Sequence, residues 1–322
     1  MELVCVGNAL MDVIAFVDED FAPSMGFHNG STVHMDAPRL AAVLARINAP
    51  VMCSGGGAAN AARVAAILGS SACFYGSVGD DETGRAYCRD LSGTGVELFI
   101  SLSPSPTGLF LSLVRPDGGR TVLVAPGAAL DLCLEAPPAS LFRPGAVLYL
   151  EGFLLRDRSF FVNCIEGGRA AGMRIGLDLG SLSLVERERD FILEILTDYC
   201  DWLFANDDEF CALTGLPLSE GLDLLADSGP AVVVKRSERG AIYAEGELRL
   251  ESPVRALYPV DETGAGDAFA AGFLTGVAKG LPPERCLRLG NRIAEEVLLV
   301  PGLSVDPERL RAALTSVSAW PE

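Results

Sequence analysis

The stretch Gly264-Ala265-Gly266-Asp267 has residue types and spacing that could do chemistry. Its glycines let the backbone approach a ligand closely, and the free N–H groups at the start of the following helix favour an anion. Asp267, in the first turn of that helix, could accept a proton from a group held beside the anion. An acidic residue there can also serve only the helix dipole, which is worth about 0.3–1 kcal/mol. This stretch, which we call the anion cradle, therefore predicts either an anion site with a base or an ordinary helix start.

Polar residues also follow the first apolar run of the chain. Asn8 and Asp12 interrupt that run at its C-terminal end, where ligands sit in parallel α/β sheets, although both could equally be loop caps. The next polar loop is rich in glycine and opens an alanine-rich helix at residues 61–68. It is not a phosphate loop of the nucleotide-binding kind, because no Gly-Lys-Ser/Thr follows and the Gly-x-Gly-x-x-Gly spacing is absent.

Two later strand ends carry charged residues. Asn206 and Glu209 follow the apolar run 202–205, and their separation of one helical turn lets both face the same side. Lys235 ends the run 231–234 and is either a phosphate contact or an ordinary strand-end charge.

Composition limits the classes of function. The chain has 322 residues, of which 49% are hydrophobic, so it can bury one large core or a core with a small accessory domain. A formal charge of −18 argues against nucleic acid or anionic membrane as a partner. The only histidines, His28 and His34, give a Ser-His-Asp or histidine-metal mechanism little support. The nine scattered cysteines fit a reducing cytosol, and we expect a cytoplasmic protein with no membrane span.

The pattern of apolar runs predicts a mainly parallel, doubly wound, Rossmann-like α/β sheet with a small β-sheet lid. Strands are expected at 146–151, 174–178, 202–205 and 231–235, with helices between them. A hairpin at 107–124 and two strand-like runs at 12–18 and 31–35 do not fit the repeating pattern. We therefore assign residues 13–36 and 107–125 to the lid, and residues 1–12, 37–106 and 126–322 to the core.

The residues around the cradle resemble the ribokinase (PfkB-type) family of small-molecule kinases. The family's hallmark near the C-terminus is Asp-Thr-x-Gly-Ala-Gly-Asp, and Glu262 stands here where the family usually has threonine. Ser237 likewise replaces a glycine that is usual in the turn after Lys235. The residues that match the hallmark are Asp261, Thr263, Gly264, Ala265, Gly266 and Asp267.

The resemblance implies a fold and a set of roles. It implies a kinase of the ribokinase-like fold in which Asp267 is the general base and the amides of Ala265 to Asp267 hold developing charge. It also implies that Asp12 binds the hydroxyl groups of the substrate. The spelling Gly-Asn-x-Leu-x-Asp is similar to the adenosine-kinase branch. Residues on the acceptor side are then Asn8, Asp12, Gly55, Gly56 and Asn60.

The family resemblance implies ATP and Mg²⁺ as the other reactants. Glu209 would act on Mg²⁺ through water, and an aspartate matching Asp261 often holds a monovalent cation such as K⁺ next to the cradle. The helix that carries Asn291 closes the adenine pocket in the family. Residues on the nucleotide side are then Asn206, Glu209, Lys235, Gly240, Thr263 and Asn291.

Several functions remain open. The acceptor is a nucleoside such as adenosine, as Asn8, Asp12 and the long lid suggest, or a sugar such as ribose, fructose or a ketogluconate. A non-catalytic sensor that binds a nucleoside or sugar on a kinase fold is the alternative of another class. The stretch 107–114 is apolar on both alternating faces, which predicts a homodimer through the lid sheet.

Overall fold

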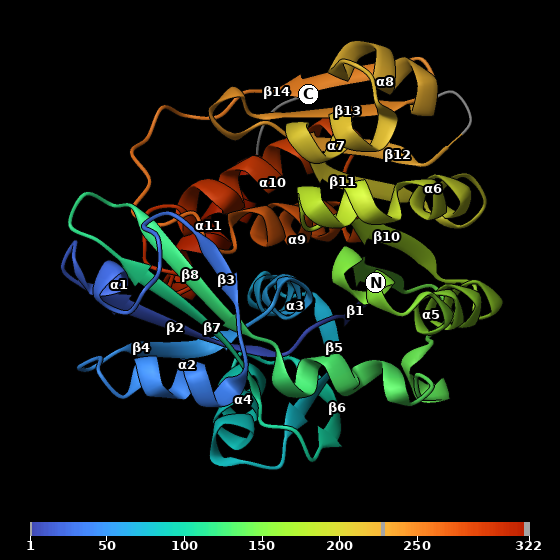
Figure 1. Cartoon of the computed structure of the whole chain (residues 1–322). Coiled ribbons are helices and arrows are strands. Elements are labelled where there is room, and N and C mark those ends of the chain that lie inside the picture. The colour runs from blue at the N-terminus through green and yellow to red at the C-terminus, as the bar shows by residue number, and fades with distance from the viewer. Residues whose placement is uncertain (1, 227–228, 319–322) are drawn as a thin grey trace.

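The computed structural model describes residues 2–226 and 229–318, and within them the largest element is a nine-stranded sheet (Figure 1). Its strand order is β14-β13-β12-β11-β10-β9-β1-β5-β6, parallel except where β13 pairs with β12 and β14. This confirms the predicted doubly wound, mainly parallel sheet. The strands are β1 (Glu2–Val6), β5 (Ser71–Gly79), β6 (Glu97–Ser103), β9 (Val147–Glu151), β10 (Arg174–Asp178), β11 (Trp202–Asn206), β12 (Ala231–Lys235), β13 (Ala241–Glu245) and β14 (Leu248–Ser252).

Helices cover both faces of this sheet. One face packs on α3 (Gly57–Ile67), α4 (Glu82–Ser92), α9 (Ala265–Ala278), α10 (Pro283–Val297) and α11 (Pro307–Ser318). The other packs on α5 (Arg158–Ala170), α6 (Leu182–Tyr199), α7 (Asp207–Thr214) and α8 (Leu218–Ala226). Short 3₁₀ segments lie at Gly127–Leu134, Ala139–Leu141, Gly152–Arg156 and Ser237–Arg239. Among the described residues, none of these helices has the length and apolar character needed to cross a membrane.

The strand order reverses at β1, which lies between β5 and β9. In open α/β sheets, ligands bind outside the carboxyl ends of the strands at such a reversal. The loop that follows β1, residues 7–9, lies at this point and leads directly into the smaller sheet. The fold therefore places the predicted polar loops along one edge of the large sheet.

The smaller sheet has five strands in the described residues, in the order β3-β8-β7-β2-β4, and it lies to one side of the large sheet (Figure 1). Its members are β2 (Leu10–Phe16), β3 (Thr32–His34), β4 (Val51–Gly55), β7 (Gly108–Val114) and β8 (Arg120–Ala125). β7 and β8 form the predicted antiparallel hairpin. The sheet begins at Leu10 and includes β4, so the predicted lid ranges were too narrow at both places. The apolar run of β4 comes directly before a helix and so looks locally like the strand of a β-α unit. Its antiparallel pairing with β2 cannot be seen in the sequence.

The apolar outer face of the smaller sheet is covered within the chain. Helix α2 (Ala37–Leu44) packs on β7 and β8, and its Leu40 and Val43 are buried with Leu111 and Leu123 of the sheet. The short helix α1 (Phe21–Ser24) adds Ala22 to the same cluster. The apolar pattern of residues 107–114 thus has an explanation inside one chain, and it no longer calls for a lid-to-lid dimer.

Candidate active site

The anion cradle forms the N-terminus of α9. Gly264 is the N-cap residue with φ of +76°, a left-handed conformation that favours glycine, and a Cβ there would lie 2.1 Å from Leu303 Cδ1. The Ala268 amide donates to the Gly264 carbonyl at 2.9 Å. The amides of Gly266 and Asp267 precede this first helical bond, so the helix itself gives them no acceptor. The turn can therefore donate several N–H groups to an anion at a helix N-terminus.

Asp267 lies at the cradle and is held by Asn60 of α3. Asn60 Nδ2 donates to Asp267 Oδ2 at 2.9 Å, although the two residues are 207 positions apart. Burial raises the pKa of Asp267; the hydrogen bond from Asn60 opposes this effect, and the net direction is upward. Asn60 Oδ1 is buried and has no partner among the described residues. A raised pKa suits a general base that must take a proton near neutral pH.

Lys235, at the end of β12, lies behind the cradle. Its Nζ would be 3.3 Å from a Cβ on Gly266, so a glycine there leaves room for the ammonium group. Nζ donates to Asp178 Oδ2 at 2.8 Å. Burial lowers the pKa of Lys235, but the carboxylates of Asp178 and Glu209 outweigh it and the net pKa is raised. The cradle thus has a full positive charge beside its amides.

Asp12 lies on β2, with 6% of its surface exposed, on the face of the smaller sheet that looks toward the core. Burial raises the pKa of Asp12 to about 8, and the charge of Asp267 adds to the effect. A Cβ on Gly55 would lie 2.2 Å from Asp12 Cγ, so only glycine fits next to this carboxyl group. The carboxyl groups of Asp12 and Asp267 therefore lie close enough to influence each other electrostatically.

The loop after β1 packs against the start of α3. A Cβ on Gly56, whose φ is +97°, would lie 2.0 Å from the Asn8 carbonyl oxygen. The Asn8 amide donates to Glu151 Oε1 at 2.6 Å, and Ala58 N donates to Glu151 Oε2 at 3.1 Å. Asn8 Oδ1 accepts from Arg156 Nη1 at 2.8 Å. Burial raises the pKa of Glu151 to about 7. The loop after β1 that carries Asn8 is thus tightly fixed against Gly56 at the start of α3.

Asp261 precedes the cradle and binds an arginine from the lid. Its Oδ1 accepts from Arg120 Nη1 of β8 and from Thr263 N and Oγ1 at 3.0 and 2.8 Å, while its Oδ2 accepts from Gly302 N at 2.7 Å. Arg120 Nη1 also donates to Thr263 Oγ1 at 2.6 Å. Both carboxylate oxygens accept hydrogen bonds from the chain, and Arg120 supplies a positive charge beside Oδ1. Arg120 thus joins the lid to the cradle.

Asn206 and Glu209 form a capping box at the start of α7. Glu209 N donates to Asn206 Oδ1 at 2.8 Å, and Asn206 N donates to Glu209 Oε2 at 2.9 Å. The buried Glu209 carboxylate interacts electrostatically with Lys235, which places it on the cradle side. No group of three or more acidic, histidine or cysteine side chains could hold a metal among the described residues. A single carboxylate fits Mg²⁺ that keeps its waters and is carried by phosphates.

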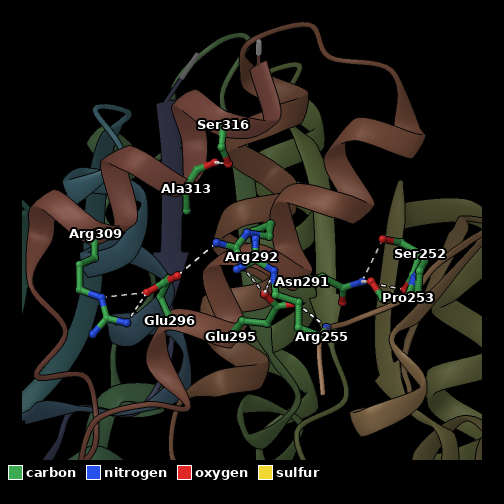
Figure 2. A network of polar contacts seen from close by, with 10 residues as sticks. All are labelled: Ser252, Pro253, Arg255, Asn291, Arg292, Glu295, Glu296, Arg309, Ala313 and Ser316. Atoms are coloured by element: carbon green, nitrogen blue, oxygen red, sulfur yellow. Dashed lines mark hydrogen bonds and ion pairs between the residues drawn. The ribbon is translucent and has the colours of Figure 1, made fainter. Parts of the chain in front are cut away.

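Asn291 of α10 fixes the loop that leads from β14 to the cradle. Its Nδ2 donates to the Ser252 carbonyl at 2.8 Å and to Ser252 Oγ at 3.0 Å (Figure 2). Arg255 N donates to Glu295 Oε1 at 2.9 Å farther along the same loop. The side chain of Asn291 is thus used in holding this loop, and any contact of the residue with a nucleotide would have to come beside that role.

The turn after Lys235 is fixed by its packing. A Cβ on Gly240, whose φ is +81°, would lie 2.0 Å from the Ser252 carbonyl oxygen, so glycine is required there by both shape and conformation. Ser237 adopts φ of +50°, which is strained for a residue with a Cβ and explains why glycine is usual at this position. Both residues shape the turn next to the loop that Asn291 holds.

Three charged residues at this edge were not predicted. Arg120, Glu151 and Asp178 reach the site from β8, β9 and β10. Glu151 and Asp178 each end a buried apolar strand, which is the same signal that pointed to Lys235 and could have singled them out. Arg120 follows a glycine-rich turn, and nothing in the local sequence indicates that it points to the core.

The chain is similar to known kinases over nearly its whole length. Residues 1–309 match the model of the pfkB family of carbohydrate kinases. The chain is 28% identical over 326 residues to a nucleoside kinase from Methanothermobacter thermautotrophicus, a match that covers 99% of this chain and 96% of that protein. The structure of an adenosine kinase from Sinorhizobium meliloti is similar, with a TM-score of 0.89, 30% identity and coverage of 98% and 99%. A probable sugar kinase from Rhizobium etli is similar with a TM-score of 0.89, 28% identity and 98% coverage of both chains.

Proposed function

Because the chain belongs to the pfkB family of carbohydrate kinases, we propose that it transfers the γ-phosphate of ATP to a primary hydroxyl group of a nucleoside or sugar. The family makes it a phosphotransferase that acts on an alcohol group. The observation that carries the proposal is the Asn60–Asp267 hydrogen bond at the N-terminus of α9, since it sets a base beside an anion site. In-line phosphoryl transfer needs both a base for the acceptor hydroxyl group and an anion site for the transferred phosphate.

Asp267 takes the proton of the acceptor hydroxyl in this mechanism. Asn60 orients its carboxylate through the 2.9 Å hydrogen bond. The amides of Ala265 to Asp267 and the ammonium of Lys235 stabilise the negative charge that develops on the transferred group. Arg120 of the lid donates to Thr263, next to the same turn, and a lid held in this position would exclude water as a competing acceptor.

The acceptor side favours a nucleoside over a simple sugar. Asp12 pairs across the smaller sheet with Phe110 of β7 and with Cys53 of β4, so these side chains share its face. Ile14 lies two residues farther along β2 on that face, and Phe110 is only half-buried. A carboxyl group that binds vicinal hydroxyls beside an apolar and aromatic surface suits a ribose joined to a flat base. The substrate we propose is therefore an adenosine-like nucleoside.

Mg²⁺ belongs to the proposal as a partner of ATP. When bound, Mg²⁺ would neutralise charge on the β- and γ-phosphates. Glu209, buried beside Lys235, would bind its waters, and Asn206 holds Glu209 in place through the capping box. Asn291 keeps the loop before the cradle in position and Gly240 shapes the neighbouring turn, so both would support the nucleotide from outside the reacting groups.

The proposal is tested by ADP release from Mg²⁺-ATP across a panel of acceptors. The panel holds adenosine, other nucleosides, ribose, fructose and 2-keto-3-deoxygluconate. We expect turnover with adenosine or another nucleoside at micromolar KM. Turnover with a sugar alone would overturn the nucleoside assignment and keep the kinase. Tight binding of a nucleoside with no turnover of any acceptor would favour a sensor instead.

Replacing Asp12 with asparagine should stabilise the chain while it weakens acceptor binding. The pKa of Asp12 is about 8 in the fold against an ordinary 3.8, so the folded state keeps a proton that the unfolded chain loses between these pH values. The free energy of unfolding therefore falls as the pH rises from about 4 to about 8, because in this range only the unfolded chain can ionise Asp12. We expect Asp12→Asn to be more stable than the parent at pH 9 by about 1 kcal/mol or more, and to show a raised acceptor KM.

Urea unfolding at pH 5 and pH 9 measures the first effect, and acceptor KM at saturating ATP measures the second. The stability difference should be smaller at pH 5 than at pH 9, because at pH 5 only a small part of the range between the two pKa values has been crossed. A variant whose ATP KM changes while its acceptor KM does not would reverse the placement of the two substrates.

A further inference from the structure

A buried charge pair supports the cradle from inside the sheet. Lys235 ends β12 and Asp178 ends β10, with β11 between them, so the two side chains meet across one strand. Lys235 Nζ donates to Asp178 Oδ2 at 2.8 Å, and the side chain of Asp178 is 7% exposed. This Oδ2 also accepts from the Tyr149 hydroxyl of β9 at 3.0 Å. Asp178 thus ties three strands together at their carboxyl ends.

The pair is placed by an aromatic layer beneath it. Tyr149 packs edge-on against Phe204 of β11, with ring centroids 6.1 Å apart, and Phe204 packs edge-on against Phe273 of α9 at 5.6 Å. The polar groups of Tyr149, Asp178 and Lys235 lie at the end of this layer that is next to the N-terminus of α9. Packed aromatic rings leave little freedom to the hydroxyl group that donates to Asp178. The carboxylate is therefore held rigidly relative to the cradle.

The carboxylates around Lys235 explain why its ammonium group needs a fixed hydrogen-bond partner. Its ammonium faces Asp178 from β10, Glu209 from α7 and Asp267 from α9. Of these three carboxylates, Asp178 is the one that accepts a direct hydrogen bond from Nζ. Without it, the flexible lysine stem could turn toward Asp267, where an ion pair would neutralise the base. The position of Nζ near Gly266 depends on Asp178.

We infer that Asp178 is a positioning residue that holds the Lys235 ammonium against the back of the anion cradle for the phosphates of ATP. This inference rests on the proposed kinase function. Among the described residues, Asp178 has no hydrogen bond to the cradle or to Asp267; it holds Lys235, and its charge also raises the pKa of Asp267. Tyr149 in turn orients Asp178 through its hydroxyl group.

The experiment is a double-mutant cycle of Asp178→Asn and Lys235→Met, read by ATP and acceptor KM and by ATP binding in calorimetry without acceptor. Asp178→Asn should raise the KM and Kd of ATP about tenfold and leave acceptor KM within about twofold. Lys235→Met should have an effect at least as large, and the double variant should bind ATP no more weakly than Lys235→Met alone. General damage to the fold would instead raise both KM values.

Asp201→Asn is the matched control. Asp201 also joins an ion pair, with Arg169 at 3.1 Å, and accepts from Ile175 N of β10 at 2.7 Å, but at the opposite end of the sheet. It should leave the KM of ATP unchanged. If Asp178→Asn alone fails to fold, the double variant should fold, because it also removes the buried ammonium that has lost its hydrogen-bonded partner.

Three results would overturn the inference. They are additive losses in the cycle, ATP binding by Asp178→Asn equal to that of the parent, and failure of the double variant to fold. Failure of the unmodified chain to bind Mg²⁺-ATP would remove the proposed kinase function as well. An unmodified chain that binds ATP, with Asp178→Asn binding it equally well, would remove only the role of Asp178.

Discussion

Replacement of Asp267 with asparagine is expected to lower kcat by about 10²–10⁴ while the chain stays folded, because this is the usual contribution of a positioned general base. Asparagine keeps the volume of the side chain, and its carbonyl oxygen can still accept the hydrogen bond from Asn60 Nδ2. The asparagine side chain cannot, however, take the proton from the hydroxyl group of the acceptor substrate. The loss should appear in kcat at saturating ATP and acceptor, with a thermal melt to verify the fold.

Glu284→Gln provides the matched control for the helix-dipole interpretation. Glu284 lies in the first turn of α10 and pairs with Arg288, beyond the C-terminal end of α9 and thus at the opposite end of that helix from the cradle. Both variants lose a charge at a helix N-terminus, so both lose a favourable interaction with the helix dipole of about 0.3–1 kcal/mol. Only Asp267→Asn should lose turnover. If it keeps near-normal kcat, Asp267 is an ordinary helix-start residue and the base must be another group.

The pH profile gives a second view of the same residue. A general base must be ionised, so kcat falls as pH drops through its pKa. Burial raises the pKa of Asp267, and the acid limb of the profile should therefore lie above the pH at which an ordinary aspartate titrates. In Asp267→Asn the remaining activity should lack this limb.

The cradle could be predicted from sequence because its parts are contiguous. Four residues contain the turn, the glycines and the helix start, so local rules suffice. The partners of the cradle come from far away in the chain: Asn60 lies 207 positions from Asp267, and Asp178 lies 57 positions from Lys235. These pairs form only when helices and strands pack, and no local pattern records which side chains meet.

Arg120 illustrates a different limit of sequence reasoning. It is 141 positions from Asp261, and the two meet because the lid rests against the loop before the cradle. The family resemblance pointed to Asp261 as a cation site, and the structure places a guanidinium group of the same chain there. The resemblance implied a cation next to this carboxylate, whereas the contact with Arg120 depends on how the two sheets lie against each other.

The lid boundary failed for a related reason. The run Val51–Gly55 leads into α3 and resembles the strand of a β-α unit, yet it pairs antiparallel with β2. Strand direction depends on which neighbour is available in space, and a five-residue run contains no sign of it. This pairing matters for function, because it brings Gly55 against Asp12 and Gly56 to the start of α3.

Gly56→Ala is expected to disable the acceptor side of the site and lower kcat/KM for the acceptor by at least about 10². A Cβ at this position would lie 2.0 Å from the Asn8 carbonyl oxygen, which is backbone and cannot rotate away. The loop after β1 must then move, and with it the Asn8 amide that donates to Glu151. The φ of +97° adds strain. We expect a loss of about 2–4 kcal/mol in the free energy of unfolding, while the KM of ATP stays within about threefold.

Gly69→Ala separates backbone strain from the clash, because Gly69 lies just beyond the other end of α3 with φ of +83°, and a Cβ there would have no atom within 4 Å. It should lose only about 1 kcal/mol of stability, the cost of a left-handed alanine, and it should keep the acceptor kcat/KM of the parent. Denaturant unfolding and steady-state kinetics on both variants decide the matter. Equal losses in the two would mean that the loop after β1 adjusts freely, and the acceptor would then have to be bound by residues that do not depend on the contact between Gly56 and Asn8.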